Sequence, residues 1–380
     1  MKNKKVLVAI PCLLLGGTEY QTLNLVKALR DSGYDVKVIC YFEHDSRMVA
    51  YMRNTGAEVI LMSESSIRPK GFFAKASSLF NGFRNALKSY KPDIVHVQYM
   101  APGSLAILLF KLLGAKKVLA TAHVPGHIYK NTSVPRFITQ YMTELFLCVS
   151  KSSEHAFFDS EPHLYDTQLH LVGRKHFTVY NCTDIPEQQP RSTTNHPLTL
   201  GVVSRLSHEK GIDILIRAMP KILSLFPDLR LLIVGDGARR QALQTLSIEL
   251  YCDHAITWAG LQPKELLESY YAQMDIVVIP SRFEGFGLTA IEAMSYSIPV
   301  IASSVDGLAE VIEDQKSGML VKPEDPSALV DAIVSLMQDP DQRQQIGENG
   351  YKRVKATFAY NIYQKTIASM YSTLMKGSSR

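Results

Sequence analysis

Short apolar runs rich in valine and isoleucine alternate along this chain with longer segments whose apolar residues recur every three or four positions. The first pattern is typical of strands buried on both faces, and the second of amphipathic helices. Their alternation predicts parallel β-sheets whose strands are joined by helices. In the first half we expect strands at 6–11, 35–41, 58–62, 94–98, 118–123 and 147–150, and helices at 19–32, 48–55 and 72–89. In the second half we expect strands at 199–204, 230–234, 256–258 and 275–279, and helices at 211–225, 239–250, 263–272 and 288–296.

The alternation is interrupted at the polar and proline-rich stretch 184–197, which is typical of a linker. A chain of 380 residues is also long for one hydrophobic core. We therefore expect an α/β protein with two facing doubly wound, Rossmann-like domains, residues 1–190 and 191–358, and a last helix within 359–380 that crosses back to the first domain. Paired domains of this kind bind ligands in a cleft at the carboxyl ends of their strands.

The composition fits this interpretation, with 46% apolar and 20% charged residues. Five cysteines without a Cys-x-x-Cys spacing indicate neither a disulfide framework nor a zinc site, so a reducing cytoplasm is the expected compartment. The N-terminal lysines and apolar run imitate a secretory signal, but no small-x-small cleavage site follows, and we expect a β-strand there. The longest uncharged run, 94–110, is too short and too broken to cross a bilayer.

The most informative segment is 281–304, SRFEGFGLTAIEAMSYSIPVIASS, which places Glu284 on a loop and Glu292 within the following helix. An unpaired charge at Glu292 would be costly, because its neighbours in the helix are apolar. The free backbone N–H groups of Gly287, Leu288 and Thr289 would face a phosphate at the helix start. The two carboxylates would then accept hydrogen bonds from sugar hydroxyls, so the segment predicts a nucleotide-sugar site.

Other candidate residues also follow predicted strands. Arg205 and Lys210 lie on the loop after 199–204 and would neutralise a diphosphate at the start of the next helix. Gly16 and Gly17 allow the backbone to approach a ligand closely after the first strand. His123 ends the strand 118–123 ahead of a turn and is expected to be functional, whereas His96 and His127 are expected to be structural.

These motifs resemble those of glycosyltransferase family 4, in which two glutamates separated by seven residues hold the donor. The resemblance continues through Pro299, Val300, Gly307 and Glu310 and covers nearly the whole chain. It implies that Glu284 faces the donor sugar, that Glu292 accepts the ribose hydroxyls, and that His123 approaches the reacting carbon. It implies catalytic roles for Glu284, His123, Arg205 and Lys210. The implied donor-binding residues are Gly16, Gly17, Arg205, Lys210, Glu284, Gly285, Phe286, Gly287, Leu288, Thr289 and Glu292.

The chain departs from the family pattern at Ser297 and Asp306, where many members carry glycine. Asp306 leaves the identity of the donor sugar open. The resemblance otherwise implies a retaining, metal-independent hexosyltransferase with the GT-B fold, without a cofactor, that uses a nucleoside diphosphate-sugar, a UDP-sugar rather than a GDP-sugar. The implied acceptor is a glycan or a lipid-linked sugar of bacterial surface polysaccharide synthesis, and no nucleic-acid partner is implied.

Two other functions remain open: a nucleotide-sugar epimerase of the same fold, which needs no acceptor, and an inactive interaction subunit derived from a transferase. Two patterns carry no function. The segment 234–240 imitates a dinucleotide fingerprint, but Arg240 stands where a third glycine is needed. Asp339 and Asp341 have an Asp-x-Asp spacing between two helical patterns, which we interpret as a helix cap and not as a metal site.

A basic segment lies in the first half. Residues 65–92 contain no acid, whereas 68–91 contain Arg68, Lys70, Lys75, Arg84, Lys88 and Lys91. Phe72, Ala76, Leu79, Phe80, Phe83 and Leu87 recur at helical spacing. One interpretation is a helix packed on the sheet with a solvated basic face. The other is that the basic face, with Phe73 beside it, contacts anionic lipid at the inner face of the cytoplasmic membrane.

Overall fold

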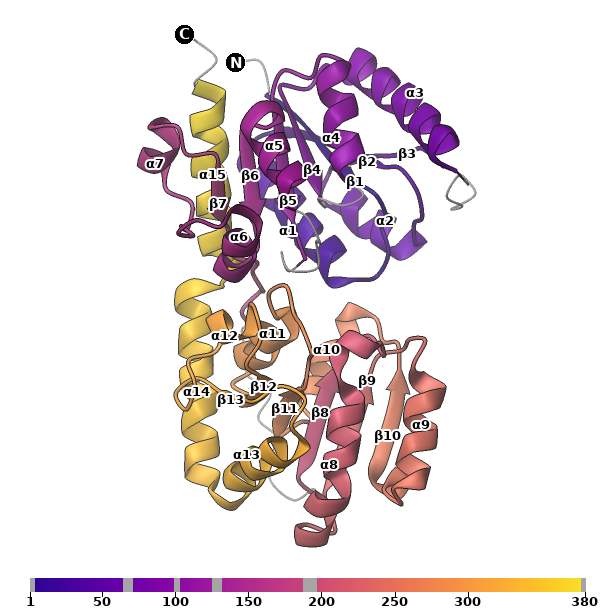
Figure 1. Cartoon of the computed structure of the whole chain (residues 1–380), viewed down its shortest axis with the longest axis vertical. Coiled ribbons are helices and arrows are strands. Elements are labelled where there is room, and N and C mark those ends of the chain that lie inside the picture. The colour runs from indigo at the N-terminus through magenta and orange to yellow at the C-terminus, as the bar shows by residue number, and fades with distance from the viewer. Residues whose placement is uncertain (1–3, 64–70, 99–102, 125–131, 187–196, 377–380) are drawn as a thin grey trace. The chain divides into compact units, whose positions relative to one another are not determined.

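The computed structural model describes residues 4–63, 71–98, 103–124, 132–186 and 197–376. Contacts divide the chain into two compact units, Met1–Cys182 together with Tyr360–Arg380, and Thr183–Ala359. The expected boundary at 190 lies outside the described residues. The last helix, α15 (Tyr360–Lys376), belongs to the first unit, where it lies against α1 (Gly17–Asp31) (Figure 1).

The first unit is a seven-stranded parallel sheet with the strand order β3-β2-β1-β4-β5-β6-β7. The order reverses between β1 and β4, which makes this pair the topological switch point. Its strands are β1 (Lys5–Ile10), β2 (Asp35–Cys40), β3 (Glu58–Leu61), β4 (Ile94–Gln98), β5 (Val118–Ala122), β6 (Leu145–Cys148) and β7 (His176–Thr178). Its further helices are α2 (Ser46–Asn54), α3 (Phe72–Tyr90), α4 (Gly103–Leu112), α5 (Ser133–Met142), α6 (Lys151–Phe158) and α7 (Thr167–Leu171).

Helices cover both faces of this sheet, which explains why its strands are apolar at successive positions. In β1, Val6 and Val8 pack in the core beneath α1, α2 and α15. Leu7 and Ala9 point to the opposite face, into the core beneath α3, α4 and α5. A strand with one solvated face would have carried polar residues at every second position.

The second unit repeats this design with six strands in the order β10-β9-β8-β11-β12-β13, all parallel. Here the order reverses between β8 and β11. Its strands are β8 (Thr199–Val203), β9 (Arg230–Val234), β10 (Ile256–Gly260), β11 (Ile276–Ile279), β12 (Val300–Ser303) and β13 (Met319–Val321). Its helices are α8 (Ile212–Leu225), α9 (Arg240–Glu249), α10 (Lys264–Tyr271), α11 (Leu288–Ser295), α12 (Leu308–Val311), α13 (Pro326–Gln338) and α14 (Pro340–Thr357), with short 3₁₀ turns at His208–Lys210 and Asp253–Ala255.

The doubly wound α/β fold is confirmed, and every predicted strand and helix is present with ends shifted by at most two residues. Asp339 caps α14 as expected, since its side chain accepts a hydrogen bond from the Gln342 N–H at 2.8 Å. The expectation that Phe80 packs on the sheet is wrong, because 39% of its surface is exposed.

Candidate functional site

Two loops of the second unit leave the sheet where its strand order reverses. The loop 204–211 follows β8, and the loop 280–287 follows β11, the neighbouring strand. Both loops start at the carboxyl ends of parallel strands, where open α/β sheets bind their ligands. They carry Lys210 and Glu284, which the sequence predicted for a donor site.

Lys210 and Glu284 form an ion pair. The Lys210 Nζ lies 2.6 Å from the Glu284 Oε2, and each side chain is 18% exposed. The ammonium group has three N–H donors, of which this contact uses one. The pair therefore joins the two loops and leaves donors on Lys210 for an anion.

Arg282, which the sequence analysis did not single out, fastens the same two loops. Its guanidinium group donates two hydrogen bonds of 2.9 Å to the Asp213 carboxylate, a bidentate ion pair. It also donates to the His208 carbonyl at 2.8 Å, and its backbone N–H donates to the Glu209 carbonyl at 2.8 Å. The Arg282 guanidinium lowers the pKa of Asp213, so the pair remains charged. In the sequence, this ion pair was indicated only by the two charges themselves. One is a basic residue shortly after β11, and the other is an acid shortly after the loop 204–211.

Gly211 permits the close approach of these loops. Its φ of +61° lies in the left-handed region, and a Cβ atom there would meet the Pro280 carbonyl oxygen at 1.9 Å. A contact that short with backbone cannot be relieved by a rotamer change. Glycine at 211 is therefore a geometric requirement for bringing Lys210 to Glu284.

Glu292 lies on α11 with its carboxylate half-buried. It accepts a hydrogen bond of 3.0 Å from the hydroxyl of Tyr271, a side chain that is 1% exposed. Burial raises the pKa of Glu292, while Lys264 and the Tyr271 hydroxyl oppose part of that rise. The Tyr271 ring in turn stacks on Tyr296 at 5.2 Å. Burial thus disfavours the charge of Glu292, and the Tyr271 hydroxyl stabilises it. Its role as an acceptor for ligand hydroxyls stays a prediction.

The start of α11 is shaped by its buried loop. Gly287 has a φ of +105°, and Phe286 is 2% exposed with its ring against Phe358 at 5.6 Å. The Thr289 hydroxyl donates to the Val203 carbonyl at 3.0 Å, so this side chain fastens α11 to β8. Leu288 is half-buried. Only the backbone amides of this turn, which have no intrahelical acceptor, are suited to an anion.

The two departures from the family pattern share one backbone property. Ser297 and Asp306 both have positive φ, +56° and +38°, the region that favours glycine. The Asp306 Oδ2 accepts a hydrogen bond of 3.2 Å from the Glu284 N–H, and the Gly307 N–H donates to the Glu284 carbonyl at 3.2 Å. Asp306 therefore keeps the turn expected for glycine and adds a carboxylate beside the Glu284 backbone.

The structure does not give the two expected cations a common partner. The Arg205 side chain is 71% exposed and lies 3.3 Å from the Glu209 carboxylate, whereas Lys210 binds Glu284. The two cations therefore contact different carboxylates, and their binding of one diphosphate stays a prediction. Charge and spacing suggested equal roles, but the direction of each side chain is set by its neighbours.

In the first unit, Gly16 is the N-cap of α1 and Gly17 is its first residue, so the helix begins two residues earlier than predicted. A Cβ atom on Gly16 would lie 2.6 Å from the Glu19 Oε2. Glu19 itself is only 5% exposed and accepts a hydrogen bond of 3.2 Å from the Cys12 thiol. The glycine turn therefore rests against a buried carboxylate, which the sequence analysis did not consider.

His123 is half-buried directly after β5, next to the switch point. Its Nε2 lies 2.8 Å from the Gln98 Oε1 at the end of β4, and burial lowers the pKa of the His123 imidazole to about 3. Gln98 is 1% exposed, and its Nε2 has no hydrogen-bond partner within the described residues.

The other two histidines were expected to be structural. His96 is buried between the Tyr371 hydroxyl and the Thr121 hydroxyl, each at 2.7 Å. His127 lies outside the described residues.

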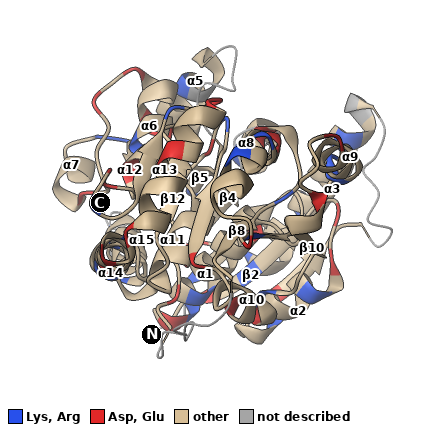
Figure 2. Cartoon of the chain, turned by 90° about the horizontal axis from the view of Figure 1, so that it is seen from below, with Lys and Arg blue, Asp and Glu red and all other residues tan. Residues whose placement is uncertain are grey.

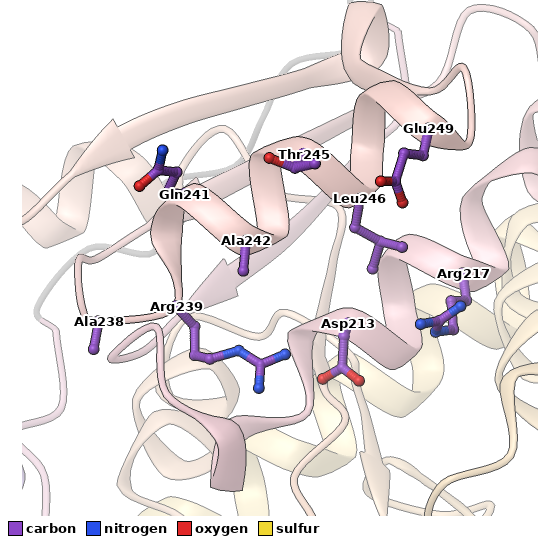
Figure 3. A pocket seen from close by; sticks show the side chains of 9 residues that line it. All are labelled: Asp213, Arg217, Ala238, Arg239, Gln241, Ala242, Thr245, Leu246 and Glu249. Atoms are coloured by element: carbon purple, nitrogen blue, oxygen red, sulfur yellow. The ribbon is translucent and has the colours of Figure 1, made fainter.

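A separate groove of about 530 Å³ lies between α8 and α9. Figure 3 shows the Arg239 guanidinium extended toward Asp213 along this groove. Arg239 contributes to the lowered pKa of Asp213, after Arg282. None of the predicted donor-binding residues lines the groove, so its size does not make it the candidate site. It borders that site at Asp213 and at Arg239, whose backbone N–H donates to the Leu206 carbonyl at 2.9 Å.

Within the described ranges, no helix is long and apolar enough to cross a membrane. The same ranges contain no group of three or more histidine, cysteine or acidic side chains placed to hold a metal ion.

The comparisons with known proteins agree with the fold. Residues 15–185 match Glycosyltransferase Family 4, and residues 184–353 match Glycosyl transferases group 1. Sucrose-phosphate synthase from Thermosynechococcus elongatus has a similar structure, with a TM-score of 0.81, 22% identity, and coverage of 99% of this chain and 100% of that one. HepE of Anabaena in complex with UDP and glucose has a TM-score of 0.79 at 19% identity, over 97% and 100% of the two chains.

Two relatives come from Methanocaldococcus jannaschii, both uncharacterized glycosyltransferases. One is 26% identical over 95% of both chains, and the other is 36% identical over 46% of this chain and 44% of its own length. The capsular polysaccharide biosynthesis glycosyltransferase CapM of Staphylococcus aureus is 30% identical over 50% of each chain. This chain thus spans about half the length of most of these relatives.

The two Rossmann-like domains, with the strand orders described above, have the GT-B fold of the similar solved structures. Both halves of the chain match glycosyltransferase family models, and the chain belongs to glycosyltransferase family 4.

Proposed function

We propose that the protein transfers a hexose, with retention of configuration, from a nucleoside diphosphate-sugar to a hydroxyl of a glycan or lipid-linked acceptor in bacterial surface polysaccharide synthesis. The observation that carries the proposal is the Lys210–Glu284 pair at the switch point of the second unit. The HepE complex with UDP and glucose supports a UDP-sugar as the donor, and CapM supports the polysaccharide role.

The donor would find a partner for each of its parts. The diphosphate binds the remaining N–H donors of Lys210 and the first amides of α11, since both are positive. The carboxylate of Glu284 accepts hydrogen bonds from the sugar hydroxyls, and that of Glu292, supported by Tyr271, accepts them from the ribose. Asp306 adds a second carboxylate near the sugar, so it is the residue that would select among hexoses.

Catalysis in this proposal is electrostatic. The bond between the anomeric carbon and the diphosphate oxygen breaks, and negative charge develops on the diphosphate beside Lys210. The acceptor oxygen forms the new bond on the same face of the sugar, and its proton passes to a phosphate oxygen. No side chain acts as a nucleophile, and no metal ion is required.

His123 would contribute a neutral imidazole. Because burial lowers the pKa of His123 to about 3, the ring is uncharged at neutral pH. It can then donate or accept a hydrogen bond at the sugar, but it cannot serve as a cation for the phosphates. The Gln98 side chain, at 2.8 Å, fixes the direction of the ring.

Ligand-observed NMR with UDP-, GDP- and ADP-sugars tests the donor. We expect saturation transfer to a UDP-sugar, loss of that signal in Glu284→Gln and Lys210→Ala, and an unchanged signal in the exposed control Glu324→Gln. Incubation with labelled donor alone separates the alternatives. Conversion of the sugar without an acceptor would indicate an epimerase, and binding of none of these nucleotide-sugars would contradict the proposal.

A further inference from the structure

Three neighbouring helices of the first unit, α3, α4 and α5, contain no acidic residue. Residues 65–143, which include them, contain eleven lysines and arginines and a single acid, Asp93. Helices α8 and α9 of the second unit, by contrast, carry both signs of charge (Figure 2). Residues 65–143 thus carry a strong excess of positive charge.

The three helices cover the same face of the sheet. Phe83 of α3, Phe110 of α4 and Ile138 of α5 belong to one buried core, and the rings of Phe83 and Phe110 stack at 4.0 Å. Helix α3 contacts α4, and α4 contacts α5. Their outer sides thus form one continuous surface, which we term the acid-free face.

Cations at the end of α3 lack partners on this face. Arg84, Lys88 and Lys91 are exposed at a spacing that places them on one side of the helix, and they form no ion pair within the described part of the chain. Lysines near the edge of the layer are paired instead: Lys111 lies 3.9 Å from Glu144, and Lys116 lies 3.6 Å from Asp93. The uncompensated charge is concentrated on α3.

Apolar side chains are exposed on the same face. Helix α5 exposes Val134 and Phe137 at 53% each and Tyr141 at 65%, and the rings of Phe137 and Tyr141 lie 5.0 Å apart. Helix α4 exposes Leu112 at 70%, and α3 exposes Phe80 at 39%. Single exposed apolar residues are common, but a cluster of them marks an interaction surface.

We propose that the acid-free face docks on an anionic lipid bilayer, with Phe137 and Tyr141 at the level of the headgroups and the cations of α3 against lipid phosphates. Tyr141 is suited to the membrane interface, where its apolar ring and its polar hydroxyl are both satisfied, and Phe137 beside it would bury its apolar ring there. Each cation near an anionic surface strengthens binding about fivefold, the equivalent of about 1 kcal/mol. Because the apolar cluster and the cations lie in one helical layer, a bilayer can contact both at once. The sequence placed this contact in 68–91; Arg68 and Lys70 lie outside the described residues, and the structure adds α4 and α5.

Sedimentation of the full chain with vesicles tests the proposal at low salt. We expect binding to vesicles of phosphatidylcholine with about one third phosphatidylglycerol and none to phosphatidylcholine alone. The double variant Phe137→Ser with Tyr141→Ser, and separately Arg84→Glu with Lys88→Glu, should each weaken binding at least tenfold. Leu171→Ser with Val172→Ser removes an even more exposed apolar pair at the end of α7. Lys352→Glu with Lys355→Glu reverses exposed charges on α14. Neither control should change binding.

The variant Phe137→Trp provides a second readout that does not depend on weakened binding. Its fluorescence should shift to shorter wavelength with anionic vesicles, whereas that of Val172→Trp should not. Equal sedimentation with both vesicle types, or none, overturns the proposal. The proposal is also overturned if the protein binds polyuridylate as tightly as vesicles and the double variant Phe137→Ser with Tyr141→Ser does not weaken that binding. The face would then recognise RNA. A dimer in analytical ultracentrifugation that the same double variant dissolves would assign the face to a second copy of the chain.

Discussion

Lys210 and Glu284 lie 74 positions apart in the sequence, yet the ammonium and the carboxylate meet at 2.6 Å, each 18% exposed. The pair exists because β8 and β11 are neighbours in the sheet although β9 and β10 separate them along the chain. Two loops with opposite charge therefore start side by side. In the proposed function, a diphosphate-sugar that binds between them would meet a cation and a carboxylate acceptor.

Lys210→Ala should lower kcat about 100-fold, and Arg205→Ala less than tenfold. The lysine is held at the switch point, whereas Arg205 is 71% exposed and paired with Glu209, and exposed pairs contribute little. Steady-state kinetics of both variants measures the difference, and activity should survive EDTA. Equal losses would show that Arg205 leaves Glu209 when donor binds, and rescue of EDTA-treated enzyme by magnesium would contradict a metal-independent reaction.

Asp213→Asn should lower the Tm, and it should lower kcat/KM about tenfold, although Asp213 is not expected to touch the donor. It removes the charge from the bidentate ion pair that joins Arg282 to the first turn of α8, next to the loop 204–211. The matched control is Glu324→Gln, which removes the other partner of Arg282, a side chain that is 65% exposed. Calorimetry and kinetics of the two variants test this. Equal effects would mean that Arg282 does not depend on the Asp213 contact.

Glu292→Gln should weaken donor binding about 10- to 100-fold, the loss of one charged hydrogen-bond partner. The same change should raise the Tm by about 2 °C. Burial raises the pKa of Glu292 in the folded state. The charge of Glu292 therefore lowers stability progressively as pH rises from the ordinary glutamate range through the raised pKa. Calorimetric titration and thermal melts at pH 7 measure both. A variant that loses stability would show that the charge supports the fold.

Gln98→Glu should raise the pKa of His123, because a carboxylate would replace the neutral acceptor at 2.8 Å from its Nε2. In the wild type, with a pKa of about 3, His123 should not titrate between about pH 5 and 8. NMR of the imidazole resonances follows the change. Identical titration of His123 in both proteins would exclude Gln98 as the residue that orients it.

Glu154→Gln should lower the free energy of unfolding by about 3 kcal/mol, the effect of breaking a buried ion pair. The Glu154 side chain is fully buried and contacts Arg174 at 2.8 Å, His176 at 2.8 Å and Thr178 at 2.7 Å. Burial raises the pKa of Glu154, but these partners outweigh it and the net pKa is lowered, so the stabilisation is present at neutral pH and is lost as pH falls through the lowered pKa. Urea unfolding measures this, with exposed Glu161→Gln as a control expected to change stability by less than about 0.5 kcal/mol.

Several helices and strands of the structure were not predicted from the sequence, because they are too short or too uniformly apolar to show a period. Strands β7, β12 and β13 are three or four residues long, and α12 has four residues, too few for a period to be recognised. Helix α4 is apolar nearly all round, so it has no polar face to reveal its period. The exposure of Phe80 is likewise a tertiary property, because its neighbour Leu79 takes the inward position on α3.

The sequence by itself determined the two α/β halves and named Lys210, Glu284 and Glu292, because strand and helix periods and glycine turns are local properties of the chain. Only the tertiary structure decided which of these groups meet. Strand order brings Lys210 to Glu284, burial supplies Tyr271 for Glu292, and the exposed Arg205 pairs with Glu209 instead. The Arg282–Asp213 contact was equally invisible, since ion pairs depend on distances that no spacing along the chain encodes.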